Sequence, residues 1–442
     1  MQITPEFLHK YNQPGPRYTS YPPANHFTES FNAASHSEAI RRSNTEQPQA
    51  ISLYVHIPFC PKLCYFCGCT TQIGGRDEQI VRYVDAVIRE INMTAPLMDN
   101  TRPVTQIHWG GGTPNSIPMA QIRRIMDTIY AHFTLTPHAE VAMECSPAYL
   151  EFEDIDELRD MGFNRISMGI QDLRADVLAS INRDAPKHPV KKLVDYMKAK
   201  GFEGVNLDLV YGLPRQTVDS FLDTVAKIVE IRPDRLVTFS YAHVPWVKKG
   251  QVVLEKYGLP TPEEKMQMLV QSMEYLNAQG YQTIGMDHYA LPTDSLAQAL
   301  ATKKLHRNFQ GYCTRETTGQ VYGFGASSIS QLQGAYSQNL KVTRDYMNAI
   351  EAGNFPTERG YSLSVIEQIR RDVINEIMCN AFLDFDEIAT KYDKPTDEIK
   401  EIVAYEAHKL DSFVADSLVN ISGNQITISE AGRLIVRNIA MV

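Results

Sequence analysis

The chain of 442 residues lacks the long apolar runs that anchor proteins in a bilayer. No stretch approaches the roughly 18–20 consecutive apolar residues of a membrane-spanning helix. Residues 1–23 also lack a central apolar stretch and are interrupted by prolines, so they do not read as a secretory signal. We therefore expect a cytoplasmic protein with no membrane partner, in a compartment where thiols stay reduced.

Positive charge and cysteine are also scarce. The 43 basic residues are outnumbered by 52 acidic ones, which gives a net charge of −9 and disfavours a nucleic-acid partner. Seven cysteines in a chain of this length exclude a disulfide scaffold. The remaining composition, 43% hydrophobic and 21% charged, is that of a globular protein able to bury a sizeable core.

Strand-like runs, rich in β-branched and aromatic residues, alternate with amphipathic helical patterns from residue 51 onwards. The predicted strands are 51–57, 104–109, 139–144, 164–170, 204–211 and 235–243. The predicted helices between them are 78–93, 120–132, 154–161, 190–200 and 218–230. This alternation predicts an α/β fold with a parallel sheet. Six units fall short of the eight in a complete barrel, so the pattern leaves open a six-unit open barrel or a doubly wound sheet.

We divide the chain into three regions. Residues 1–50 form an N-terminal arm with many turn formers, and residues 51–360 hold the strand–helix region and its extension, including a helix at 262–279. Residues 361–442 form a small, mainly helical domain. Its predicted elements are helices at 365–379, 385–392, 396–411 and 429–440, and a hairpin that turns at Gly423-Asn424. This order is winged-helix-like, but eight Lys and Arg against 14 Asp and Glu argue against DNA contact.

Four of the seven cysteines fall within ten residues, as Cys60-x3-Cys64-x2-Cys67-x-Cys69. Three thiolates in such a loop can each hold one iron of an iron–sulfur cube, and the fourth iron then stays open to a small molecule. A tetrahedral zinc site using all four cysteines is the competing interpretation, followed by a redox thiol. The crowding of the four cysteines favours iron–sulfur. The run Gly110-Gly111-Gly112 after a predicted strand is interpreted either as a ligand contact or as a tight turn.

The cysteine spacing, with Phe66 directly before the third cysteine, resembles the signature of radical S-adenosylmethionine (SAM) enzymes. Further motifs narrow the resemblance to the oxygen-independent coproporphyrinogen III oxidases, also called dehydrogenases. In order, these motifs are PGPRYTSYP (14–22), LYVHIPFC (53–60), CYFCGC (64–69), HWGGGTP (108–114), SMGIQD (167–172), NLDLVYGLP (206–214), GMDH (285–288) and HRNFQGY (306–312). They spread across nearly the whole chain.

The resemblance implies a partial (β/α)6 radical-SAM barrel that holds a [4Fe-4S] cluster and two SAM molecules. It assigns Cys60, Cys64 and Cys67 as cluster ligands and leaves Cys69 as a non-ligand. The residues expected to contact the first SAM are Tyr54, Gly111, Glu144 and Ile329. Those expected to contact the second are Phe66, Gly112, Thr113, Gln171, Arg183, Asp208 and Ala242. The glycine run is accordingly assigned to SAM contact.

The implied reaction is the oxidative decarboxylation of two propionates of coproporphyrinogen III to the vinyl groups of protoporphyrinogen IX. A 5′-deoxyadenosyl radical from SAM starts it, and the electron donor and acceptor are unidentified. We expect a monomer whose porphyrinogen substrate contacts Arg17, Phe309 and Gln310. The main alternative is a related haem chaperone without oxidase activity, followed by a radical-SAM haem-opening methyltransferase. The PRYTSYP arm and Cys69 favour the oxidase over the chaperone.

Overall fold

The structure is a computed structural model that describes residues 10–11, 15, 18–315 and 319–442. Its scaffold is a sheet whose six central strands are parallel and neighbour one another in chain order. These strands are β1 (Ile51–Ile57), β4 (Val104–Gly111), β5 (Leu135–Cys145), β6 (Arg165–Gln171), β7 (Gly204–Tyr211) and β8 (Arg235–Ser240). A doubly wound sheet reverses its strand order at a switch point. The winding is therefore that of an incomplete (β/α)6 barrel, and all six predicted strands are confirmed.

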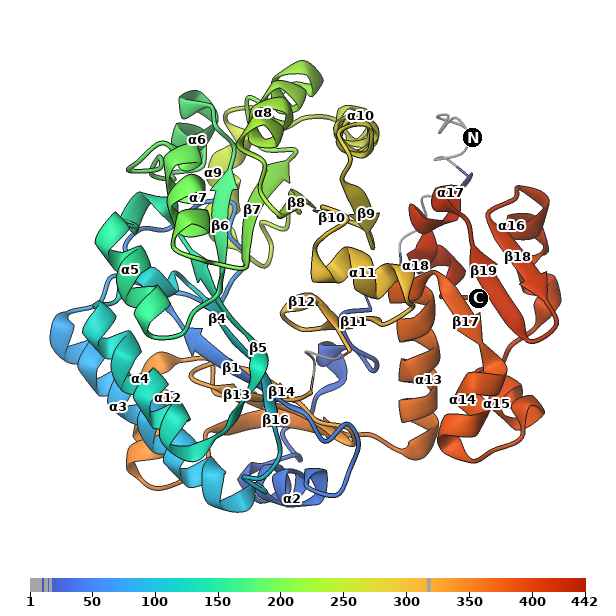
Figure 1. Ribbon diagram of the computed structural model, residues 1–442, viewed down its shortest axis with the longest axis horizontal. Coiled ribbons are helices and arrows are strands. Elements are labelled where there is room, and N and C mark those ends of the chain that lie inside the picture. Colours follow the sequence, from blue (N-terminus) through green and yellow to red (C-terminus); the bar gives the residue numbers. More distant parts are fainter. Residues whose placement is uncertain (1–9, 12–14, 16–17, 316–318) are drawn as a thin grey trace.

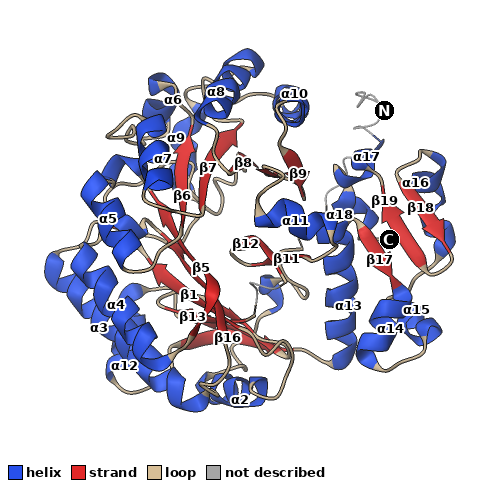
Figure 2. Cartoon of the chain, in the orientation of Figure 1, coloured by secondary structure: helices blue, strands red, loops and turns tan. Residues whose placement is uncertain are grey.

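Helices return the chain between these strands along the outer face of the sheet (Figures 1 and 2). They are α3 (Asp77–Thr94), α4 (Met119–His132), α5 (Phe152–Asp160), α7 (Val190–Ala199) and α8 (Val218–Ile231). Each was predicted to within two residues at either end. Strand β1 buries both faces, and α3 turns Tyr83, Val87 and Ile91 into the same core. Burying a large apolar side chain of this kind contributes about 1.5–3 kcal/mol.

Further strands extend the sheet beyond both ends of the parallel core. On one side β13 (Gln320–Phe324) pairs parallel with β1, followed by antiparallel β14 (Ile329–Gln331), β15 (Ala335–Asn339) and β16 (Thr357–Ser362). On the other side lie β10 (His288–Ala290) and β9 (Gln282–Ile284). Within the described residues, edge strands β16 and β9 are not paired with each other. The hairpin of β11 (Leu305–Asn308) and β12 (Gly311–Thr314) lies between the barrel and the C-terminal helices (Figure 1).

A buried ionic network ties together three of the parallel strands. Glu140 of β5 lies 2.9 Å, Oε2 to Nε, from Arg165 of β6 and 3.7 Å, Oε2 to Nη2, from Arg235 of β8. Arg235 Nε in turn lies 2.8 Å from Oδ1 of Asp294. Burial alone would raise the pKa of Glu140, but the two arginines outweigh it and lower that pKa to about 2. The carboxylate therefore stays charged and holds the two arginines in place.

The described part of residues 1–50 packs in two places. Helix α2 (Ala33–Ser43), capped by the Asn32 side chain, sends Ile40 into the barrel core. Tyr11 instead stacks on Phe413 of the C-terminal region, with ring centroids 5.2 Å apart. The division of the chain at residues 50 and 360 stays a prediction.

The C-terminal region contains helices and a three-stranded antiparallel sheet, as the winged-helix-like prediction requires. The helices are α13 (Val365–Asn375), α14 (Phe385–Tyr392), α15 (Thr396–Ile402), α16 (Asp411–Ala415), α17 (Glu430–Arg433) and α18 (Val436–Ile439). The strands are β17 (Phe382–Asp384), β18 (Val419–Ser422) and β19 (Gln425–Ile428). The last two form the predicted hairpin around Gly423-Asn424.

Two helices predicted in this region were too long, and a third, predicted at 365–379, changes from the α-helix α13 to a π-helix at Glu376–Asn380. The helix predicted at 396–411 ends at Ile402 because Ala404 adopts a left-handed φ of 54° and the Tyr405 amide bonds to the Lys400 carbonyl. The helix predicted at 429–440 is interrupted after Arg433 and resumes at Val436. No helix in the described residues is long and apolar enough to cross a bilayer.

The remaining elements connect these parts. They are the helices α6 (Ala175–Ser180), α9 (Val252–Glu255), α10 (Pro262–Ala278), α11 (Ser295–Ala301) and α12 (Thr343–Glu351), and the short strands β2 (Phe59–Cys60) and β3 (Gln72–Ile73). Helix α10 confirms the helix predicted at 262–279. The strand predicted at 235–243 ends earlier, at Ser240, where the chain leaves the sheet.

Candidate active site

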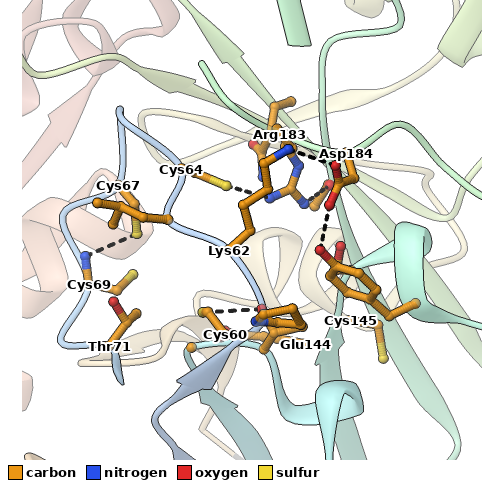
Figure 3. A pocket seen from close by; sticks show the side chains of 18 of the residues that line it. Cys60, Lys62, Cys64, Cys67, Cys69, Thr71, Glu144, Cys145, Arg183 and Asp184 are labelled. Atoms are coloured by element: carbon orange, nitrogen blue, oxygen red, sulfur yellow. Dashed lines mark hydrogen bonds and ion pairs between the residues drawn. The ribbon is translucent and has the colours of Figure 1, made fainter. Parts of the chain in front are cut away.

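The candidate site is a cavity between the cysteine loop, which follows β1, and the carboxyl ends of β4 to β7 (Figure 3). In barrels of alternating strands and helices, this end of the sheet carries the functional groups. Predicted site residues that line the cavity are Cys60, Cys64, Phe66, Cys67, Gly111, Gly112, Thr113, Glu144, Gln171, Arg183 and Asp208. The fold thus brings the three predicted ligands together with eight of the eleven residues predicted to contact SAM. Their roles as ligands stay predictions.

The four clustered cysteines lie on one loop and border this cavity (Figure 3). Burial raises the pKa of the Cys60 and Cys64 thiols. A hydrogen bond from the Cys69 side chain lowers the pKa of Cys67 to about 6, and the same bond raises that of Cys69. Cys67 is therefore disposed to be a thiolate and Cys69 a thiol. Because the pKa values of Cys60 and Cys64 are raised as well, this criterion does not separate the predicted ligands from Cys69.

The donor set fits an iron–sulfur cluster. Three cysteine thiols on a single loop are the soft ligands that such clusters take. No group of three His, Cys, Asp or Glu side chains among the described residues is close enough to bind one metal ion. The thiols stand around a cavity, which leaves space between them for a group larger than a single ion.

The glycine run at the end of β4 is dictated by close packing against the strand before the cysteine loop. Gly111 has a φ of 116°, and a Cβ there would lie 2.6 Å from the imidazole Cε1 of His56. A Cβ on Gly112 would lie 2.5 Å from the carbonyl oxygen of Pro58. Larger residues are thus excluded by the protein itself. The tight-turn interpretation is supported, and it is compatible with a SAM contact because both glycines also line the cavity.

A line of polar rings leads from β1 to Glu144. The Glu144 carboxylate, at the end of β5, lies 3.0 Å from His108 Nε2. The His108 ring stacks on Tyr54, with centroids 6.1 Å apart, and the Tyr54 hydroxyl lies 3.1 Å from Nδ1 of His56. Burial lowers the pKa of His56 to about 4, so this imidazole is neutral. Tyr54 therefore contacts the site through His108 and does not itself line the cavity.

Arg183 joins the cysteine loop to β6. Its guanidinium donates to the Gly169 carbonyl, and its Nη1 lies 3.7 Å from the Cys64 sulfur. The neighbouring Asp184 accepts hydrogen bonds from Lys62 Nζ, at 2.8 Å, and from the Tyr149 hydroxyl, at 2.7 Å. Sequence reasoning missed these three side chains. The only signal was the position of Lys62 inside the cysteine loop and of Asp184 directly after Arg183.

Asp208 of β7 carries a perturbed carboxyl. It accepts hydrogen bonds from the Ser167 hydroxyl, at 2.9 Å, and from the Asn206 amide, at 2.8 Å. Burial raises the pKa of Asp208 to about 6, although the bond from Ser167 acts in the opposite direction. The carboxylate is ionised at neutral pH, and it can accept hydrogen bonds from ligand hydroxyl groups.

Several predicted residues lie away from the cavity lining. Ala242 is exposed after the end of β8. Ile329, on β14, packs against a small apolar cluster that also receives Phe309 from the tip of the β11–β12 hairpin. The backbone amide of Gln310 donates to the Asn308 side chain within the same turn. Arg17 falls outside the described residues.

Comparisons with known proteins agree with this geometry. Residues 54–228 match the model of the radical SAM superfamily. The oxygen-independent coproporphyrinogen III oxidase of Synechocystis is 41% identical over 443 residues, which is 100% of this chain and 95% of that protein. The enzyme of the same name from Escherichia coli is 40% identical, over 98% of this chain and 93% of that one.

A solved structure extends the likeness to three dimensions. The coproporphyrinogen III oxidase of Escherichia coli, described as a radical SAM enzyme, superposes with a TM-score of 0.89 over 96% of both chains, at 39% identity. The resemblance inferred from the ordered motifs is confirmed. With identity near 40% sustained from end to end, this chain belongs to the oxygen-independent coproporphyrinogen III oxidases of the radical SAM superfamily.

Proposed function

We propose that this chain catalyses the oxidative decarboxylation of two propionate side chains of coproporphyrinogen III, which yields the vinyl groups of protoporphyrinogen IX. The observation that carries the proposal is the meeting of three loop thiols with carboxylate, amide and guanidinium groups in one cavity. Membership of the family supports the same substrate class.

In this proposal Cys60, Cys64 and Cys67 hold a [4Fe-4S] cluster. Two SAM molecules contact the eight lining residues named above together with Tyr54, Ala242 and Ile329. When bound, the cluster and SAM supply a 5′-deoxyadenosyl radical, which can take a hydrogen atom from a propionate β-carbon. The protein contributes binding, orientation and exclusion of water.

Two charged side chains suit the two ends of a SAM molecule. The Arg183 guanidinium has the fork geometry that pairs with a carboxylate, and the loop Cys64 lies beside it. The Asp208 carboxylate, anchored by Ser167 and Asn206, suits a ribose diol. Both side chains are fixed by neighbours before any ligand arrives, which reduces the entropy lost on binding.

The propionates of the substrate are anionic, whereas the chain carries a net charge of −9. The substrate must therefore be held by local basic side chains. We assign Arg17 to one propionate, and Phe309 and Gln310, at the tip of the β11–β12 hairpin, to the edge of the macrocycle. The hairpin lies between the barrel and the C-terminal helices, beside the open side of the sheet (Figure 1). For each vinyl formed, one CO2 leaves and one electron passes to an unidentified acceptor. We expect the protein to be a monomer and to lie in the cytoplasm.

The test is an anaerobic assay with reconstituted cluster, SAM, a chemical reductant and coproporphyrinogen III. We expect protoporphyrin after oxidation of the product, together with 5′-deoxyadenosine and methionine. Omission of SAM provides the control and abolishes all three products. Tight haem binding without decarboxylation would contradict the proposal and favour the haem-chaperone alternative.

A further inference from the structure

The cysteine loop has an outer side as well as an inner one. Besides the cavity, a second groove is lined by this loop and by residues 247–251, which follow β8. Cys64, Cys67 and Cys69 border both the cavity and the outer groove. The cysteine loop alone therefore lies between the proposed cluster and the outer groove. The groove is on the side of the loop that faces away from the cavity-lining residues of β4 to β7.

Side-chain contacts hold the segment after β8 against the cysteine loop. Lys248 Nζ donates to the carbonyl oxygen of Cys69 at 3.0 Å, and Gln251 Nε2 donates to that of Phe66 at 3.1 Å. The oxygen of the same Gln251 amide accepts from the Val244 backbone at 2.6 Å, and Gln251 is 2% exposed. The rim of the groove is thus built in a fixed position relative to the loop that carries the ligands.

This rim exposes large apolar side chains. Val247, in the lining of the groove, is 66% exposed, and Leu63, from the cysteine loop itself, is 40% exposed. Trp246, directly before Val247 and just outside the lining, is 77% exposed. The other tryptophan of the chain, Trp109, is fully buried. Exposed aromatic and aliphatic groups gathered at one place are characteristic of surfaces that bind another protein.

The outer groove is also positively charged. The described lining of the outer groove contains Lys248 and Lys249 and no acidic residue, in a chain whose net charge is −9. A basic surface on an acidic protein attracts acidic partners to this place and repels them elsewhere.

We propose that the outer groove and its rim (Leu63, Trp246, Val247, Lys248 and Lys249) are the docking surface for a small acidic one-electron carrier protein. This inference rests on the proposed function, because only a cluster that must be reduced needs such a partner. In the transfer one electron leaves the reduced carrier and enters the oxidised cluster, and no bond is made or broken. Trp246 and Val247 supply the apolar contact, and the lysines orient the carboxylates of the carrier.

The experiment compares two single charge reversals. Lys249→Glu changes an exposed lysine on the rim, and Lys192→Glu changes an exposed lysine on the outer helix α7 as the matched control. The probe is an acidic flavin mononucleotide carrier protein in its reduced form, mixed anaerobically with the reconstituted holoenzyme, and cluster bleaching is followed by absorbance. At low ionic strength we expect Lys249→Glu to slow the reduction about 10-fold, Lys192→Glu less than 2-fold, and the difference to shrink as salt rises.

Reduction by dithionite separates the two levels of inference. We expect wild type and both variants to be reduced equally by dithionite and to form product at equal rates. If dithionite gives no product with any protein, the proposed function fails. If dithionite works and the carrier reduces both variants alike, the docking surface is refuted.

Binding provides a second readout that does not depend on turnover. Carbodiimide cross-linking with mass spectrometry should join Lys248 or Lys249 to carboxylates of the carrier, and Trp246→Ala should weaken carrier binding at least 5-fold in titration calorimetry. Cross-links to a second copy of this chain at these lysines, or unchanged affinity in Trp246→Ala, would overturn the proposal.

Discussion

The carboxyl of Asp208 offers a quantitative test of the candidate site without any cofactor. Replacing it by asparagine keeps the shape and removes the charge. The new amide can accept one of the two hydrogen bonds from Ser167 and Asn206, and its NH2 group faces the other donor. The loss of one hydrogen bond lowers the free energy of unfolding by an amount that does not depend on pH. The effect of the Asp208 charge is therefore obtained from the pH dependence of that free energy.

The direction of this pH dependence follows from the pKa of Asp208, which burial raises from its ordinary value of 3.8 to about 6 in the folded protein. A carboxyl with a raised folded pKa stabilises the protein at low pH, and that contribution is lost as pH rises through 6. From these two pKa values, the loss between pH 5 and pH 8 is about 1.4 kcal/mol. Because the side chain is partly exposed, we reduce this figure to about 1 kcal/mol.

The assay is urea unfolding of the cluster-free protein at several values of pH between 5 and 8. The free energy of unfolding of wild type minus that of Asp208→Asn should fall by about 1 kcal/mol across this range. Other titrating groups are common to both proteins and cancel, except Glu144 and His288, which interact electrostatically with Asp208. Asp127→Asn, at an exposed position on α4, is the control for the substitution of aspartate by asparagine. A difference for Asp208→Asn that stays constant with pH would refute the argument that this carboxyl is desolvated.

Three further predictions concern the cysteine loop, the ionic network and the glycine turn. Cys69→Ala should reconstitute with as much iron and sulfide as wild type, whereas Cys64→Ala should lose most of both; equal losses in elemental analysis would make Cys69 a ligand. Glu140→Ala leaves two buried arginines to share Asp294, so one buried charge lacks an acid; urea unfolding should show a loss of about 3–5 kcal/mol, and a loss below about 1 kcal/mol would contradict this account. Gly111→Ala adds a Cβ 2.6 Å from a ring carbon at a φ of 116°, and calorimetry should show a loss of about 1–3 kcal/mol. An unchanged melting temperature would mean that the turn relaxes freely.

The strands and the cysteine loop could be predicted because their signals are local. Strands such as 51–57 and 204–211 are rich in β-branched and other apolar residues, and the structure reproduces their bounds to the residue. The cysteine spacing lies within ten residues, and it specifies one loop whatever the rest of the chain does. Chain-order pairing of the strands depends on the whole sheet, and the pattern alone left it open.

The missed features depend on contacts between distant residues. Alanine carries no signal for a left-handed backbone, so the sequence did not show that Ala404 would stop α15 at Ile402. Asp184 binds Lys62 across 122 positions, and no local pattern announces such a pair. Ile329 and Ala242 were predicted to contact SAM only because of the family resemblance. Ile329 lies away from the cavity lining because β14 packs it into an apolar cluster, and Ala242 because it is exposed in the turn after β8.

The two ends of the sheet do not join, and this has a consequence for how its edges can move. A closed barrel of eight strands fixes its diameter through a continuous ring of hydrogen bonds, and side chains fill its interior. Here β16 and β9, as described, end the sheet without meeting, so backbone pairing does not fix the distance between them. The spacing between these two edges can therefore change while every ladder stays intact. Loops and the β11–β12 hairpin, which tolerate substitution more readily than strands, are left to set that spacing.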